Sequence, residues 1–239
     1  LAAQVLERII VRLRKYGRTS SLDRLLSAQV KLLESAAGAL EDPRREAAHY
    51  EAGILVAELL GDDRAQASFW LGLVDRYTQT GNADMDLTLE RLEKASEAAK
   101  SAHDRPLELR IANRRAEVLL GAGEIEKASR ASRRAMEIID LEKASPVDKC
   151  NIIGVRLRCL SLSGQLGEAR ALHDMAKPIA AACPVLQRQS YLSGIAFLAV
   201  LGGDPQRAIP ETEDAISALH DANLPRLLLT PMHNLGDLR

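Results

Sequence analysis

The residue types that most often carry chemistry in proteins are scattered along this sequence. No two of the five histidines stand four residues apart on one helical face, as a pair of metal-binding imidazoles would. The sequence has no phosphate-binding P-loop, no GxSxG nucleophile, no HExxH, no EF-hand loop and no paired CxxC. Most acidic residues alternate with Arg or Lys at helical spacing, which is typical of a solvated helix face. These patterns predict a non-enzymatic chain without a metal or cofactor.

An enzymatic alternative stays open at three residues. A catalytic site would need a buried pocket that holds a carboxylate or histidine with a strongly shifted pKa. Asp75, Glu117 and His173 are the residues at which such a site would be sought first. His173 takes the place of a packed residue in a predicted helix, which favours a structural role at the edge of the core.

A pattern that recurs about every 40 residues predicts how the chain folds. Residues 112–138 contain two amphipathic segments joined at Gly123, where glycine tolerates the positive φ that a helix end often needs. Small and apolar residues recur in each half at spacings of three or four, which places them on one helix face. The same offsets recur at Ile153, Leu157, Leu160, Gly164, Ala169, His173, Ala176 and Ile179, and again at Leu192, Ala196, Ala199, Gly203, Ala208, Thr212 and Ala215.

Two registers are open upstream. In the preferred one, the helix that contains Trp70, Leu73, Val74 and Tyr77 is the first helix of a pair and ends near Gly81. Its partner then holds Thr88, Leu92 and Ala95, and the pairs stay in step with those downstream. In the other register, Trp70 lies in the second helix of a hairpin that begins at Asp42, an N-cap followed by proline.

The run Trp70-x-x-Leu73-Val74-x-x-Tyr77-x-x-x-Gly81 resembles the signature of the tetratricopeptide repeat, TPR. The resemblance implies an all-α, right-handed α-α superhelix of about 11 or 12 antiparallel helices. It divides the chain into lead-in helices at 1–43, repeats at 44–222 and the start of a truncated repeat at 223–239. The period near 40 is similar to that of the TPR arrays in MalT-like bacterial regulators.

In TPR arrays the first helices line an inner groove, and the resemblance assigns particular side chains to it. The side chains at those offsets are mixed polar, with several Arg and Asn among them. They are Asp75, Gln79, Arg110, Asn113, Arg114, Glu117, Asn151 and Arg158, with Ser161, Ser190, Ser193 and Phe197 further along. Such groups clamp the backbone or an acidic group of an extended peptide, and an ordinary solvated face is the alternative.

Composition narrows the class of partner. The net charge of -1 and pI near 6.6 give no clustered positive excess, so we expect no nucleic-acid contact. No apolar run reaches the roughly 20 residues that span a membrane, and we expect no signal peptide. Cys150, Cys159 and Cys183 are an odd number without CxxC spacing, which indicates free, buried thiols in a cytoplasmic protein.

We therefore predict a binding or sensor module of a bacterial signalling or transcription regulator. Its groove would bind a protein, a peptide or a small effector. The chain starts at Leu1 and stops within a repeat at Arg239, which indicates a fragment of a longer array whose exposed ends favour homo-oligomers. The alternatives are an assembly scaffold without a small ligand and a helical recognition domain attached to an enzyme.

Pro178 falls inside the predicted second helix of one repeat. Proline lacks the N–H that an interior helical position donates, and its ring clashes with the preceding turn. We therefore expect the helix to bend or end near Lys177.

Overall fold

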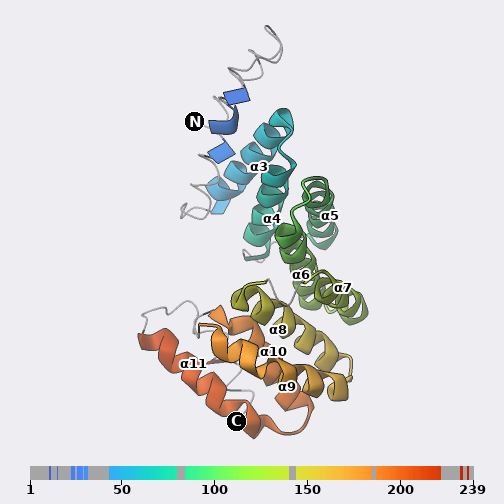
Figure 1. Ribbon diagram of the computed structural model, residues 1–239, viewed down its shortest axis with the longest axis vertical. Coiled ribbons are helices and arrows are strands. Elements are labelled where there is room, and N and C mark those ends of the chain that lie inside the picture. Colours follow the sequence, from blue (N-terminus) through green and yellow to red (C-terminus); the bar gives the residue numbers. More distant parts are fainter. Residues whose placement is uncertain are drawn as a thin grey trace. The chain divides into compact units, whose positions relative to one another are not determined.

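The computed structural model describes residues 43–79, 84–139, 144–184 and 187–221, with single positions and short runs between 11 and 31 and between 232 and 236. The helices with bounds are α3 (Pro43–Leu60), α4 (Asp63–Gln79), α5 (Met85–Ser101), α6 (Arg105–Gly121), α7 (Ile125–Ile138), α8 (Pro146–Leu162), α9 (Leu166–Ala182), α10 (Gln189–Leu201), the 3-10 helix η2 (Pro205–Arg207) and α11 (Ile209–Asp221) (Figure 1). The described residues contain no strand, which confirms the predicted all-α class.

The chain divides into two compact units, Leu1–Ile111 and Ala112–Arg239. The boundary falls within α6, and each unit is described by itself below. The predicted lead-in segment 1–43 and the truncated repeat 223–239 lie almost wholly outside the described residues.

Five turns between helices are built alike. The N–H of the residue after the turn reaches back to the carbonyl five residues earlier, at 2.9 Å from Glu124 to Leu119 and at 3.1 Å from Asp104 to Ala99. This is the Schellman ending, whose turn residue adopts a left-handed conformation. Glycine is that residue in four turns, with φ between 73° and 75°, and His103 is that residue in the fifth, with φ 53°. The glycines are Gly61, Gly123, Gly164 and Gly203. The positive φ predicted for Gly123 is confirmed.

The order of these turns bears on the two upstream registers. Gly123 joins α6 to α7, and Gly164 joins α8 to α9, as the predicted repeats require. In the first unit, however, Gly61 joins α3 to α4, and His103 joins α5 to α6. This turn pattern favours the alternative register, in which Trp70 lies in a second helix. α6 therefore follows the Schellman turn at His103 and ends in the Schellman turn at Gly123.

His103 provides a direct test of the turn chemistry. A non-glycine residue in the left-handed region loses about 1–2 kcal/mol to steric conflict between Cβ and the following carbonyl. His103 is exposed, so replacing it by glycine removes this cost and little else. We expect His103→Gly to raise the melting temperature by roughly 2–4 °C, measured by circular dichroism. Gly123→His should lower it by a similar amount, and equal melting temperatures in both variants would contradict the assignment.

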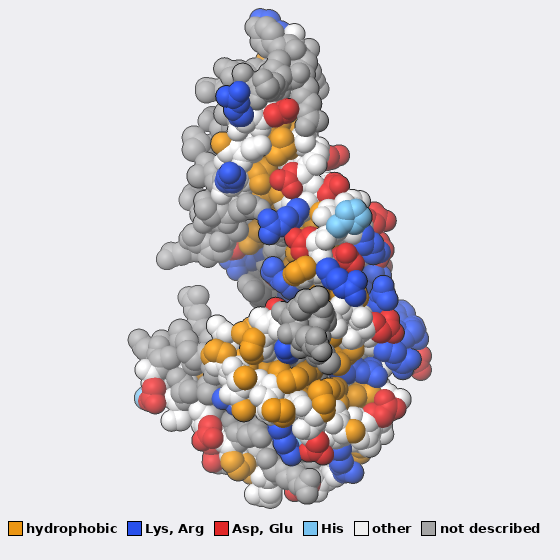
Figure 2. All heavy atoms as spheres, viewed as in Figure 1, with side chains coloured by type: hydrophobic (Ala, Val, Ile, Leu, Met, Phe, Trp, Pro, Cys, Tyr) orange, Lys and Arg blue, Asp and Glu red, His pale blue; other side chains and the backbone are white. Residues whose placement is uncertain are grey.

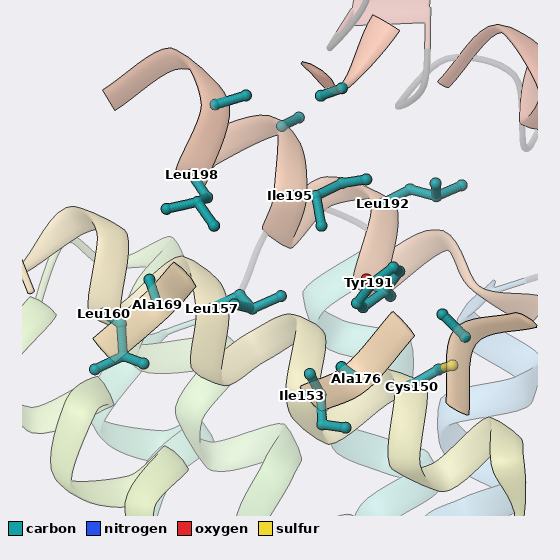
Figure 3. Close-up of a cluster of buried hydrophobic side chains, with 14 of the residues drawn as sticks. Cys150, Ile153, Leu157, Leu160, Ala169, Ala176, Tyr191, Leu192, Ile195 and Leu198 are labelled. Carbon is teal, nitrogen blue, oxygen red and sulfur yellow. The ribbon is translucent and has the colours of Figure 1, made fainter. Parts of the chain in front are cut away.

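The core of the second unit is built from α8, α9 and α10 (Figure 3). Large apolar side chains of α8 and α10 face the small residues Ala169 and Ala176 of α9. Tyr191, at 1% exposure, is the largest side chain buried in the described residues. The predicted apolar faces are confirmed here, because Ile153, Leu157, Leu160, Ala169, Ala176, Leu192, Ala196, Ala199 and Ala208 are all buried.

The core of the first unit is centred on Phe69, which is 2% exposed. Trp70 and Tyr77 are only partly buried and pack against this core. Basic side chains cover their outer faces, with the Lys94 ammonium 5.3 Å from the Trp70 ring centre and the Arg91 guanidinium 4.3 Å from that of Tyr77. Phe69, one residue before Trp70, is therefore the ring of α4 that enters this core.

Pro178 lies inside α9. We expected the helix to bend or end near Lys177, and the end is wrong, because α9 continues through Pro178 to Ala182. Asp174 and Pro178 are both exposed, so the Asp174 carbonyl, which lacks a helical donor, lies on the solvent side, where the loss of stability is small.

The predicted free, buried cysteines are confirmed, and burial beside Cys183 raises the pKa of Cys150 to about 12. In the described part of the chain, no helix is both long and apolar enough to cross a membrane.

Candidate partner-binding surface

The predicted groove residues fall in both compact units. Asp75 and Gln79 lie on α4 of the first unit, where Asp75 is half-buried and the Gln79 side chain is outside those described. Arg110, the last predicted residue of that unit, is exposed on α6. The other nine, from Asn113 to Phe197, lie in the second unit, so only these form a surface that can be described together.

Equivalent positions on α6, α8 and α10 hold Glu117, Arg158 and Phe197. Each lies six residues before the turn glycine that follows its helix, which is Gly123, Gly164 and Gly203 in turn. An ion pair joins the first two side chains, and Ser190 Oγ on α10 donates a hydrogen bond of 3.1 Å to the Asn151 carbonyl on α8. We call the surface formed by Arg114, Glu117, Arg158, Phe197, Val200 and Leu201 the α6–α8–α10 face.

One carboxylate is shared by two guanidinium groups on this face. Glu117 accepts from Arg114 at 2.8 Å through one oxygen, and Arg158 Nη2 lies 3.8 Å from its other oxygen. All three side chains are largely covered, with 22–25% exposed. Burial lowers the pKa of Arg158, and the Glu117 carboxylate opposes that shift. Two cations around one anion leave a formal charge of +1, which suits an incoming carboxylate or carbonyl oxygen.

The α10 part of the face is apolar and exposed. Phe197, Val200 and Leu201 are 37%, 43% and 45% exposed, and their spacing of three and one puts them on one side of α10. Figure 2 shows hydrophobic side chains gathered on the side of the second unit where α8 and α10 lie. A contiguous exposed apolar patch of this kind marks an interaction surface.

The two predicted asparagines lie differently. Asn113 is buried, and its side-chain oxygen has no hydrogen-bond partner among the described residues. Asn151 is half-buried, and its backbone carbonyl, as described above, ties α8 to α10. Asn151 therefore lies where α8 packs against α10.

Sequence reasoning missed two polar contacts that fix this unit. Arg156 is 7% exposed and donates to the Ser129 carbonyl and hydroxyl at 3.1 Å and to the Ser132 hydroxyl at 3.3 Å. The two serines, three apart on α7, were the available signal. His173 pairs with Tyr191, whose hydroxyl lies 2.9 Å from Nδ1, and it is half-buried at the core's edge.

The three candidate residues of the enzymatic alternative lie on different helices, α4, α6 and α9. Asp75 belongs to the first unit, whereas Glu117 is bound by arginines and His173 by tyrosine in the second. No group of three or more His, Cys, Asp or Glu that could hold a metal ion occurs among the described residues.

Comparison with solved structures identifies the architecture. A crystal structure described as "Podosopora anserina putative kinesin light chain nearly identical TPR-like repeats" aligns with a TM-score of 0.60. The alignment covers 86% of this chain and 99% of that chain at 16% sequence identity. This chain has a TPR-like repeat fold. At that identity the similarity concerns the fold alone. No family model matches the sequence, and no curated protein matches it.

Proposed function

We propose that this chain is a non-enzymatic protein-binding module that holds a segment of a partner on the α6–α8–α10 face. One observation carries the proposal. Glu117, Arg158 and Phe197 hold equivalent positions on three successive helices, which supports one proposed face that combines the Arg114–Glu117–Arg158 cluster with the exposed apolar residues around Phe197. TPR-like arrays use the groove formed by their first helices in this way, and many unrelated partners bind there.

The two parts of the face define the chemistry of the partner. An apolar anchor side chain would cover Phe197, Val200 and Leu201, where burial of exposed apolar area provides most of the affinity. An acidic side chain or a backbone carbonyl would lie against Arg158, because charge-assisted hydrogen bonds to guanidinium are strong and directional. The expected ligand is therefore an extended segment with an apolar anchor and an acidic residue nearby.

We further propose that the module serves a bacterial regulator of the MalT-like type in the cytoplasm. The repeat steps of 41 and 39 residues, from Gly123 to Gly164 to Gly203, support the long-period type. A peptide or small effector that favours one curvature of the array would then shift how an attached domain is presented. The scaffold without a small ligand, the recognition domain of an enzyme, and self-association through array ends remain the rival roles.

Selection of peptides from a random phage-displayed library tests the binding face. We expect enriched peptides to combine an apolar residue with an acidic one. Phe197→Ser should weaken their binding about tenfold or more, as loss of an interface anchor does. Leu55→Ser is the matched control, because Leu55 is 51% exposed on α3 of the other unit. Enriched peptides that bind Phe197→Ser and wild type equally would contradict the proposal.

A thermal-shift screen separates the sensor from the plain scaffold. A specific metabolite that raises the melting temperature progressively as its concentration exceeds its Kd supports the sensor, since a ligand of the folded state stabilises it by mass action. Stabilisation by selected peptides alone supports the scaffold.

A further inference from the structure

A hollow lies in the second unit, away from the α6–α8–α10 face. It has a volume of about 780 Å³ and lies between α9, α10 and the turn that leads to α11. Its apolar wall is the α10 stripe Ile195, Leu198 and Ala199, whereas the exposed residues Phe197 and Val200 belong to a different stripe of that helix. We call this hollow the α9–α10 cleft. Its size falls in the range of small-molecule sites, roughly 300–1,000 Å³.

The opposite wall of the cleft is charged. Arg170, His173, Asp174 and Lys177 follow one another at spacings of three, one and three along α9, so all four lie on one helix face. Lys177 donates to Asp174 at 2.8 Å, and that pair is more than half exposed. His173 is held against the buried Tyr191, and the two rings stack at 6.0 Å. Three of the four side chains on this wall, His173, Asp174 and Lys177, therefore already have partners.

Among the four side chains on this wall, Arg170 has the weakest hydrogen bonding. Its only hydrogen bond in the described part of the chain is a long one, 3.4 Å from Nη2 to the Gly202 carbonyl, and no carboxylate there pairs with it. This bond holds the Arg170 guanidinium next to Gly202, at the end of the apolar wall on α10. A guanidinium has five donors in a planar fork that matches a carboxylate.

The remaining charges limit the charge of a ligand. Asp204, at the end of the cleft, and Asp174 balance Arg170 and Lys177, so the formal charges of the lining sum to zero with neutral histidine. A dianion such as a phosphate monoester would meet both carboxylates, whereas a monoanion needs only the guanidinium. The apolar wall requires an apolar body on the same molecule.

We propose that the α9–α10 cleft binds a small apolar monocarboxylate. Its carboxylate accepts hydrogen bonds from the Arg170 guanidinium in place of the Gly202 carbonyl. Its hydrocarbon part lies along Ile195, Leu198 and Ala199. This inference does not depend on the proposed protein-binding face, because the two surfaces use different stripes of α10.

Isothermal titration calorimetry with octanoate tests the assignment, with octanamide as the uncharged analogue and octyl phosphate as the dianion. We expect octanoate to bind one site and to bind about tenfold more tightly than either analogue. Arg170→Gln should reduce octanoate to the affinity of octanamide. Arg133→Gln, at an exposed arginine of α7, is the matched control and should leave the affinity unchanged.

A second variant tests the apolar wall. Ala199→Leu places three additional carbons in the cleft and should weaken both octanoate and octanamide, and a melting curve shows whether the variant folds. Should it not fold, Arg170→Gln still decides the question, because Arg170 is exposed. Equal affinity for octanoate and octanamide in wild type would overturn the proposal. So would octanoate binding that survives Arg170→Gln but is lost in Phe197→Ala.

Discussion

Replacing Gly154 by alanine is expected to lower the stability of the second unit by about 3 kcal/mol. Gly154 faces α10, and a methyl group there would overlap the backbone carbonyl of Ser190 and lie 2.5 Å from the Tyr191 nitrogen. The partner position is equally close, since a methyl on Gly194 would lie 2.7 Å from the Gly154 carbonyl oxygen. Backbone atoms cannot rotate away, so the two helices would have to separate and the core between them would open.

The melting temperature measures this effect, and a drop of roughly 6–12 °C corresponds to it. Gly167→Ala is the matched control, because a methyl at Gly167 on α9 would meet nothing within 4 Å. That change should stabilise the helix by about 0.5–1 kcal/mol, since alanine restricts the unfolded chain more than glycine does. A Gly154→Ala protein as stable as wild type would mean that α8 and α10 do not approach as closely as described.

Gly154 also matters for the proposed function. Separation of α8 from α10 would move Arg158 relative to Phe197, because each lies on one of the two helices. Selected peptides should therefore lose affinity for Gly154→Ala even at temperatures at which the variant is folded. Gly167→Ala should bind them as wild type does.

The sequence predicted the repeat and its buried faces because both depend on local spacing. Apolar and small residues three or four apart identified Leu157, Leu160 and Ala176 as core, and a glycine between amphipathic segments identified the turn at Gly123. The alignment of repeats put Glu117 and Arg158 at equivalent offsets but did not specify that an ion pair joins them, as it does in the structure.

Features that depend on non-local geometry could not be predicted. The turn at His103 has no glycine to mark it, and its left-handed backbone is imposed by the helices on either side. Phe69 and Trp70 are adjacent in sequence, and only the packing of α3 and α5 decides which ring enters the core. The α9–α10 cleft likewise depends on how far two helices stand apart, which helical periodicity does not encode.

The second large effect is expected at a buried ion pair in the first unit. Arg76 of α4 pairs with Glu46 of α3, and only 7% of the Glu46 side chain is exposed. Tyr50 adds a hydrogen bond of 3.4 Å from its hydroxyl to the same carboxylate. Burial, followed by the Glu46 charge, raises the pKa of Tyr50, so the phenol keeps its proton and remains a donor.

Arg76→Met removes the cation and leaves the carboxylate buried with a single neutral donor. Breaking a buried pair in this way costs about 3–5 kcal/mol, and chemical denaturation should measure a loss of that size. Arg64→Met is the matched control, because Arg64 pairs with Asp104 at 2.8 Å but is 76% exposed, and such pairs contribute less than about 1 kcal/mol. The double variant Glu46→Gln with Arg76→Met should regain most of the stability, because neither charge is then buried alone. Equal losses in the double variant and in Arg76→Met would show that α3 and α4 depend on the arginine's packing rather than on its charge.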